Sequence, residues 1–302
     1  KRQTIHRLSL SGGNLPDQAR AGEIVEDLEK GDLVIRDLGY FSIKALADIH
    51  AKGAFYLSRL LKGTGLYLSA DPSAQAINIV GHLNRNFVHQ SVMDLDIYLG
   101  QERVPCRLIA YRAPEAVVNE RIRKAEASAR KKGRQLSEES RQWLRFSFFV
   151  TDVSREVWAA EVIGTIYRIR WQIELRFKSW KSLCQIDLLK GQRPERIQCL
   201  VYGRLITIVL MNLLYSFASW YSETRLKLET SLHKLIEWLK RRGRLSKAVL
   251  GSQFHELLND LIQDLPGMLC KKKRKRKTTL ELIEDLVPYE MSFYDEIQHV
   301  PA

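Results

Sequence analysis

A single carboxylate, Glu174, stands among phenolic and cationic side chains in the segment 167–181. At about 100° per residue, a helix through this segment gathers its polar side chains into an arc of roughly 80°. The side chains of this polar arc are Tyr167, Arg170, Glu174, Lys178 and Lys181. A carboxylate in such surroundings can bind a divalent cation while the bases hold phosphates. It can equally form i±4 ion pairs on a solvated helix face, so the spacing alone leaves both interpretations open.

A second stripe of the same helix is apolar. It is made of Val162, Ile166, Ile169, Ile173, Phe177 and Trp180. Because this stripe occupies its own sector of the helix, we expect it to face the protein core. Trp171 lies beside the polar arc, where it either packs or stacks on a base, and the sequence favours packing.

A second acid, Asp37, follows the short apolar run 33–35, which predicts a buried strand. Ligands of α/β sheets gather outside the carboxyl ends of strands, so this carboxylate can reach a cleft. An Asp before Leu-Gly is also a common turn residue. The chain continues with a helix capped by Ser42 and running to about Lys52, and then with a strand over 54–60.

The spacing Tyr167-x2-Arg170-x3-Glu174-x6-Lys181 resembles the Tyr-Arg-Glu-Lys signature of DDE transposases of the insertion-sequence-four type, the group related to the transposon-five transposase. The neighbouring Trp171, and a Trp-Lys pair that ends the run, extend the likeness.

The segment that begins at Asp37 (Asp-Leu-Gly-Tyr-Phe), with Gly53-Ala-Phe-Tyr-Leu-Ser-Arg-Leu after a helix, resembles the block around the second catalytic Asp of the same family. The two resemblances occur in the family's order along the chain.

The resemblance implies an α/β fold with a ribonuclease H-like core, which is a mixed sheet with flanking helices. It also implies a β-rich insertion before the Glu helix and a helical C-terminal region. Asp37 and Glu174 would be the catalytic acids and metal ligands of a site for two Mg²⁺ or Mn²⁺ ions. The DNA-binding residues would be Tyr167, Arg170, Trp171, Lys178 and Lys181.

Phosphodiester cleavage requires an activated nucleophile and neutralised charge on the attacking and leaving oxygens, which two carboxylate-bound metal ions supply. A DDE site has three acids, and the family's first Asp lies on a strand upstream of the predicted strand at 5–10. We therefore expect that the chain, which begins without Met, lacks its N-terminal part. The resemblance implies DNA transposition by cleavage and strand transfer at transposon ends. A catalytically inactive DNA-binding relic and another ribonuclease H-like nuclease remain the alternatives.

The composition favours a polyanion as partner. The 302 residues are 45% hydrophobic, which is enough for a sizeable core, and the net charge is +13. Lys and Arg recur along the whole chain, which favours nucleic acid over a membrane surface. With the resemblance, we expect double-stranded DNA (transposon ends and target) as the partner, a homodimer in the DNA complex, no membrane, and a bacterial cytoplasmic protein associated with the nucleoid when on DNA.

The four cysteines have neither CxxC spacing nor a nearby histidine cluster, so we expect free thiols. The apolar run 205–221 contains Asn212 and is short for a membrane span, so we expect a buried helix. Asp152 follows a predicted strand, 145–151, and is interpreted as a turn residue.

The remaining pattern predicts four regions, 1–62, 63–145, 146–222 and 223–302: the first part of the core, the insertion, the rest of the core with the Glu helix, and the helical C-terminal region. Further helices are expected at 16–30, 116–136, 195–221, 226–242 and 253–265, and strands at 76–80, 93–99 and 106–111. The helix at 116–136 is rich in Lys and Arg and either contacts DNA or is a solvated face. The seven consecutive cations at 271–277 are expected either to form a disordered, self-repelling tether or to contact nucleic acid.

Overall fold

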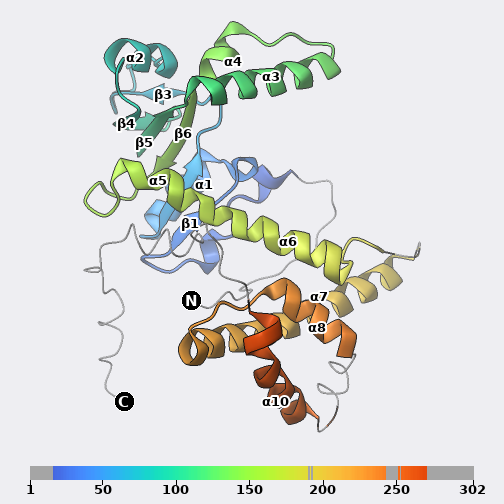
Figure 1. Cartoon of the computed structure of the whole chain (residues 1–302). Coiled ribbons are helices and arrows are strands. Elements are labelled where there is room, and N and C mark those ends of the chain that lie inside the picture. Colours follow the sequence, from blue (N-terminus) through green and yellow to red (C-terminus); the bar gives the residue numbers. More distant parts are fainter. Residues whose placement is uncertain (1–15, 190, 192, 243–250, 252, 271–302) are drawn as a thin grey trace. The chain divides into compact units, whose positions relative to one another are not determined.

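The computed structural model describes residues 16–189, 191, 193–242, 251 and 253–270 (Figure 1). These residues form two units, a sheet unit that ends at Arg170 and a helical unit that begins at Trp171. The strand expected at 5–10 and the basic run 271–277 lie outside the described residues.

Six strands of the sheet unit form one mixed sheet in the order β1-β2-β6-β5-β4-β3. The strands are β1 (Leu33–Ile35), β2 (Phe55–Arg59), β3 (Leu66–Tyr67), β4 (Val92–Leu99), β5 (Val104–Arg112) and β6 (Phe146–Thr151). β1 and β2 are parallel, and every other neighbouring pair is antiparallel. The predicted α/β class is confirmed, and the strands of the expected insertion are hydrogen-bonded into the same sheet as β1 and β2.

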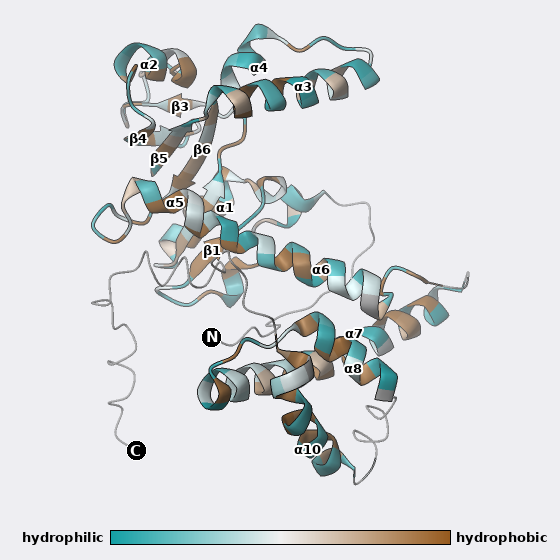
Figure 2. Ribbon diagram, viewed as in Figure 1, coloured by the Kyte–Doolittle hydropathy of each residue, from teal (hydrophilic) through white to brown (hydrophobic). Residues whose placement is uncertain are grey.

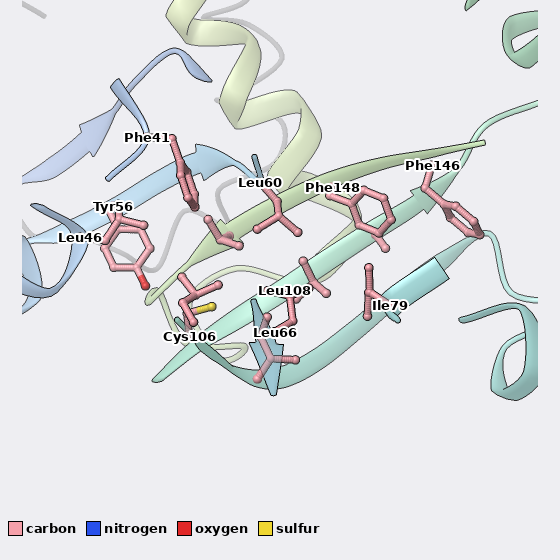
Figure 3. Packing of buried hydrophobic residues seen from close by; sticks show 14 of the residues in the cluster. Phe41, Leu46, Tyr56, Leu60, Leu66, Ile79, Cys106, Leu108, Phe146 and Phe148 are labelled. Carbon is pink, nitrogen blue, oxygen red and sulfur yellow. The ribbon is translucent and has the colours of Figure 1, made fainter. Parts of the chain in front are cut away.

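Helices cover both faces of this sheet. On one face, α1 (Ile43–Ala51), capped by Ser42, and α2 (Ile79–Asn86) pack on a core that includes Tyr56, Leu108 and Phe148 (Figure 3). On the other face, α5 (Ala160–Tyr167) packs through Ile163 and Ile166 on the alternate side chains of the same strands. Successive strand residues point to opposite faces, so one strand serves both cores.

The polar segment between β5 and β6 forms two helices, α3 (Glu115–Lys131) and α4 (Glu138–Trp143). They are largely hydrophilic in Figure 2. The expected helix over 116–136 therefore ends at Lys131, and Ser137 caps a second one.

Two local predictions are wrong. The expected helix over 16–30 is instead a pair of 3-10 turns, Asp17–Arg20 and Val25–Asp27, in a segment where several N–H groups donate to the carbonyl three residues earlier. Gly22 weakens a helix here, and the carboxylate of Asp32 accepts the N–H of Glu29 and diverts the chain. The expected strand at 76–80 is the start of α2, because Asn78 caps the helix through the Gly81 N–H.

The predicted uninterrupted helix over 167–181 is also wrong. α5 ends at Tyr167, a 3-10 turn spans Arg168–Arg170, and α6 (Trp171–Cys184) follows. The expected apolar stripe is divided accordingly: Ile166 is 3% exposed, whereas Ile173 and Phe177 are 48% and 49% exposed. Ile166 packs under the sheet, but the core of the helical unit is made by other helices and leaves the α6 stripe half uncovered.

The helical unit contains α6, α7 (Pro194–Tyr221), α8 (Leu232–Arg242) and α10 (Phe254–Asp264), which confirms three further predicted helices. Leu214, Leu235 and Leu261 lie in its core, and the Trp238 indole donates to Asp264 at 2.7 Å. Turns of π-helix follow α7 at Ser222–Leu226 and α10 at Leu265–Leu269.

α7 contains many apolar residues (Figure 2). Leu205, Ile208 and Leu214 are buried, but Ile206 and Leu213 are well exposed, so the expectation of a buried helix is wrong for one face. Within the described residues, the segment Pro194–Leu226 is the one helix long and apolar enough to cross a membrane, a criterion that core helices of soluble proteins also meet.

Candidate active site

Asp37 lies at the carboxyl end of β1, as the sequence predicts. It caps the 3-10 turn Leu38–Tyr40, and its Oδ1 accepts the Leu38 N–H at 2.8 Å. Its side chain is 56% exposed. The turn thus uses one carboxylate oxygen of Asp37. The other oxygen, Oδ2, is free of this turn and can bind a group at the sheet edge.

Arg59 ends β2 at the same edge of the sheet. Because β1 and β2 are parallel and Ile35 pairs with Leu57, the residues after Ile35 and Leu57 emerge side by side. Arg59 is exposed, and its charge acts on the Tyr167 phenol. Sequence reasoning did not single out Arg59, although a cation at the end of the strand parallel to that of Asp37 was a usable signal.

Tyr167 lies inside the sheet unit. Its hydroxyl donates to the carbonyl of Arg36 at 3.2 Å, and its ring meets Phe149 edge to face at 5.1 Å. Burial raises the pKa of the phenol. The expected hydrogen bond from Tyr167 to a DNA phosphate stays a prediction; the bond that the structure contains holds the backbone next to Asp37.

Arg170 reaches the same carboxylate. Its Nη1 lies 3.5 Å from Oδ2 of Asp37, and the guanidinium lies over the Tyr167 ring at 5.6 Å. Arg36 and Tyr167 are 131 residues apart in sequence. The segment of Asp37 and the first residues of the segment 167–181 therefore meet at one edge of the sheet.

Two side chains of β5 fix the position of α5. The hydroxyl of Tyr111 donates to the carbonyl of Ala160 and accepts the N–H of Gly164 at 2.9 Å, so the phenol is inserted between a donor and an acceptor that pair directly in a regular helix. The buried Arg107 donates to the carbonyls of Val153, Ser154 and Trp158 in the loop before α5 and to Asp94.

The remaining residues of the polar arc belong to the helical unit. Trp171, Lys178 and Lys181 are exposed on α6, and Glu174 is half-buried. α6 is anchored within this unit by Arg176, which donates to the buried Asn212 on α7 at 2.7 Å and lies over the Tyr215 ring. The metal pair of Asp37 and Glu174, and DNA contacts by Trp171 and the lysines, stay predictions.

No group of three or more His, Cys, Asp or Glu residues arranged to hold a metal occurs in the part of the chain that the structure describes. The four cysteines are free thiols, as expected. Asp152, interpreted as a turn residue, is buried and ties elements together: it accepts the Tyr56 N–H at 2.8 Å and pairs with His50 at 2.9 Å. Burial raises its pKa.

Comparison with known proteins gives a consistent result. The family model described as "Transposase DDE domain" matches residues 1–210. The chain is 30% identical over 277 residues to the transposase for insertion sequence element IS231B of Bacillus thuringiensis subsp. berliner, which covers 86% of this chain and 55% of the relative.

Two further relatives agree. The transposase for IS231C from the same subspecies is 34% identical over 215 residues, covering 66% of this chain and 45% of the relative. The transposase for IS1151 of Clostridium perfringens is 26% identical over 278 residues, covering 86% and 58%. The chain thus spans about half the length of the curated relatives it matches. Since the family model matches well over half of its residues, this chain belongs to the transposase DDE domain family.

Proposed function

We propose that this chain is the catalytic DDE domain of an insertion-sequence transposase, which cleaves and joins phosphodiester bonds at transposon ends. The observation that carries the proposal is the meeting of two motif segments at the sheet edge. Asp37 follows β1 there, Arg170 pairs with its carboxylate, and Tyr167 holds the preceding carbonyl. An acid fixed by signature residues at a strand end has the position that a metal ligand needs.

The residues at this edge fit part of a divalent cation site. A hard cation prefers oxygen ligands, and the Asp37 side chain is 56% exposed, with its Oδ2 3.5 Å from the Arg170 guanidinium. We propose Glu174 as a second ligand and expect the two carboxylates roughly 4 to 8 Å apart when they share a metal pair. Bound Mg²⁺ or Mn²⁺ ions would activate the attacking oxygen and neutralise charge on the leaving oxygen.

The chain's own residues would orient the substrate. Arg59, Lys178 and Lys181 would hold phosphate oxygens, which cations do through charge-assisted hydrogen bonds. Arg170 would hold the Asp37 carboxylate in place before the metal enters and turn to a phosphate afterwards. Trp171 is exposed, which suits a base-stacking contact better than the packed role favoured from sequence.

We infer a ribonuclease H-like core from the parallel β1-α1-β2 unit that delivers Asp37. The proposed regions remain 1–62 and 146–222 for the core, 63–145 for the insertion and 223–302 for the helical C-terminal part. The partners would be double-stranded DNA at transposon ends and target, and a second copy of the protein that pairs two ends. The location would be the bacterial cytoplasm, on the nucleoid when DNA is bound.

The decisive experiment measures cleavage of a transposon-end duplex by the full-length protein with Mg²⁺, with EDTA as the blank. Asp37→Asn and Glu174→Gln should each reduce cleavage by about three orders of magnitude, equivalent to roughly 4 kcal/mol of barrier. DNA binding should persist or tighten, because a negative charge facing phosphate is lost. Either variant cutting at the wild-type rate would refute the assignment.

Mn²⁺ binding, followed by electron paramagnetic resonance, tests whether the two acids share a site. If both hold the same ions, each single variant should weaken binding and the double variant should weaken it little further, because the sites are coupled. Additive losses would mean two separate sites. Arg59→Gln provides the contrast, since it should weaken DNA binding and leave Mn²⁺ affinity unchanged.

A further inference from the structure

The α3–α4 pair leaves the sheet from the edge that carries Asp37. β5 and β6 are antiparallel, so Arg112 at the end of β5 pairs with Phe146 at the start of β6. Phe149 of β6 in turn pairs with Arg59 at the end of β2. The chain thus enters α3 at the same edge at which β1 and β2 end, and α3 runs outward from the sheet (Figure 1).

The α3–α4 pair, called the arm below, is fixed at its base. Arg121 donates to the carbonyls of Leu144 and Phe146, each at 3.1 Å, and to the Ser147 hydroxyl at 2.8 Å. Glu126 of α3 pairs with Arg141 of α4 at 2.6 Å. These contacts join both helices to each other and to the first residues of β6, so the direction of the arm is set by the sheet.

The charges of the arm fall into two groups. In the middle of α3, Arg123 and Lys124 both pair with Glu120, and these two cations lower the pKa of that carboxyl to about 2. Farther out, four exposed cations occur within five residues. They are Arg130, Lys131, Lys132 and Arg134. None of these four has a carboxylate within salt-bridge distance anywhere in the described ranges.

The helix dipole explains cations in the last turn, because the C-terminal end of a helix carries partial negative charge. It does not account for Lys132 and Arg134, which lie beyond the end of α3. Four unpaired cations so close together repel one another and concentrate counterions. A polyanion that replaces these counterions gains the entropy of their release.

We propose that these four cations bind the phosphate backbone of duplex DNA at a distance from the bond that is cut, which rests on the proposed function of Asp37. α3 has 17 residues. At 1.5 Å per residue it spans about 25 Å, or roughly seven base pairs at 3.4 Å each. The arm therefore binds and orients DNA at a point distant from the sheet edge, and it does not contact the reacting atoms.

The test compares matched double variants of the same arm in the full-length protein: Lys131→Gln with Lys132→Gln, and Arg123→Gln with Lys124→Gln. Each removes two exposed positive charges from α3 or its end. The second pair is the control, and it also leaves Glu120 without its two partners. If only overall charge mattered, the control variant would therefore lose at least as much DNA affinity as the outer variant. Gln is a good helix former, and circular dichroism checks that both variants remain folded.

The probe is a fluorescent random-sequence DNA duplex, titrated at several salt concentrations. The outer pair of substitutions should weaken binding about tenfold and make the slope of log affinity against log salt shallower by roughly 1 to 2, since each lost phosphate contact removes about 0.9. The control pair should change affinity less than twofold. Replacing all four outer cations should extend both effects.

Equal weakening by both pairs would overturn the proposal, as would an unchanged salt slope in the fourfold variant. Polyglutamate that competes as well as unlabelled DNA would overturn the choice of DNA as partner. The outcome is separable from that of the proposed function: with DNA saturating, the outer variants should cut at a rate close to wild type, whereas Asp37→Asn should cut about a thousandfold more slowly. An outer variant that binds DNA normally yet loses cleavage would also refute the arm's role.

Discussion

The Tyr-Arg-Glu-Lys signature begins at the end of α5 and continues into α6, and these two helices are held in different ways. In α5, Ile163, Ile166 and Tyr167 are buried against the sheet, and the helix is fixed by hydrogen bonds from Tyr111 of β5. In α6, Ile173 and Phe177 are half exposed. The comparison teaches that this motif combines a buried anchor beside Asp37 with a helix whose apolar face is only half covered by its own unit.

The largest expected difference concerns one arginine in each unit, the buried Arg107 and the partly buried Arg176. Arg107→Met leaves three backbone carbonyls without their donor and removes one of the two partners of Asp94, which keeps Arg155 at 3.2 Å, so we expect a loss of about 3–5 kcal/mol. Arg176→Met leaves Asn212 without this donor and removes the cation from the Tyr215 ring, and should cost about 1–2 kcal/mol. Urea denaturation measures both, and hydrogen exchange shows which unit opens. Equal costs would mean that α6 is anchored as firmly as α5.

The next difference concerns one isoleucine of α5 and one of α6. Ile163 is fully buried, so Ile163→Ala should cost about 2–4 kcal/mol through lost transfer energy and a cavity. Ile173→Ala should cost less than about 1 kcal/mol, because half of that side chain already meets solvent. The same denaturation measurement decides. A cost at Ile173 that matches the one at Ile163 would show that the α6 face is covered in the working protein.

Tyr167→Phe tests how the end of α5 is held against the sheet. It keeps the ring against Phe149 but removes the bond to the Arg36 carbonyl, so we expect a loss of about 1 kcal/mol at neutral pH. Burial raises the pKa of this phenol above its ordinary value of 10.0. Its contribution to stability is therefore complete below pH 10 and is lost as pH rises through the folded-state pKa.

The variant should accordingly lose less stability than the wild type when alkaline denaturation is followed above that pH. Tyr202→Phe, at an exposed phenol of α7, is the matched control and should change the unfolding free energy at neutral pH by less than about 0.5 kcal/mol. A Tyr167 variant with the wild-type alkaline profile would argue against a buried phenol.

The smallest expected effect compares two helical glycines. A Cβ added at Gly203 of α7 meets nothing within 4 Å, so Gly203→Ala should stabilise the protein by about 0.5–1 kcal/mol. At Gly164 the new Cβ would lie 3.4 Å from the Tyr111 ring, the ring that is inserted at α5. We expect Gly164→Ala to lose that helix gain and to be neutral or slightly destabilising in thermal unfolding. Equal stabilisation at both sites would mean that the Tyr111 ring moves away from the added methyl group without a cost in stability.

Much of the site follows from local pattern. The run 33–35 with Asp37 behind it predicts a strand that ends in an acid, and the structure places Asp37 there. Ser42 caps the predicted helix because a hydroxyl can accept a free N–H at a helix start wherever the chain lies. The basic character of α3 is likewise visible in the composition of the chain. These features depend on neighbours in sequence, so the sequence determined them.

The tertiary structure decided the rest. Periodicity placed Tyr167 in a polar arc, but a phenol has an apolar ring and one polar atom, and the sheet buries it because Arg36 supplies an acceptor. No local signal shows that a tyrosine of β5 enters α5, or that the signature helix is interrupted at Arg168–Arg170. Which cations of α3 remain unpaired depends on Glu120, which pairs with Arg123, and on Glu126, which pairs with Arg141 of α4. The second of these pairs forms only when the chain has folded, because its two residues are distant in sequence.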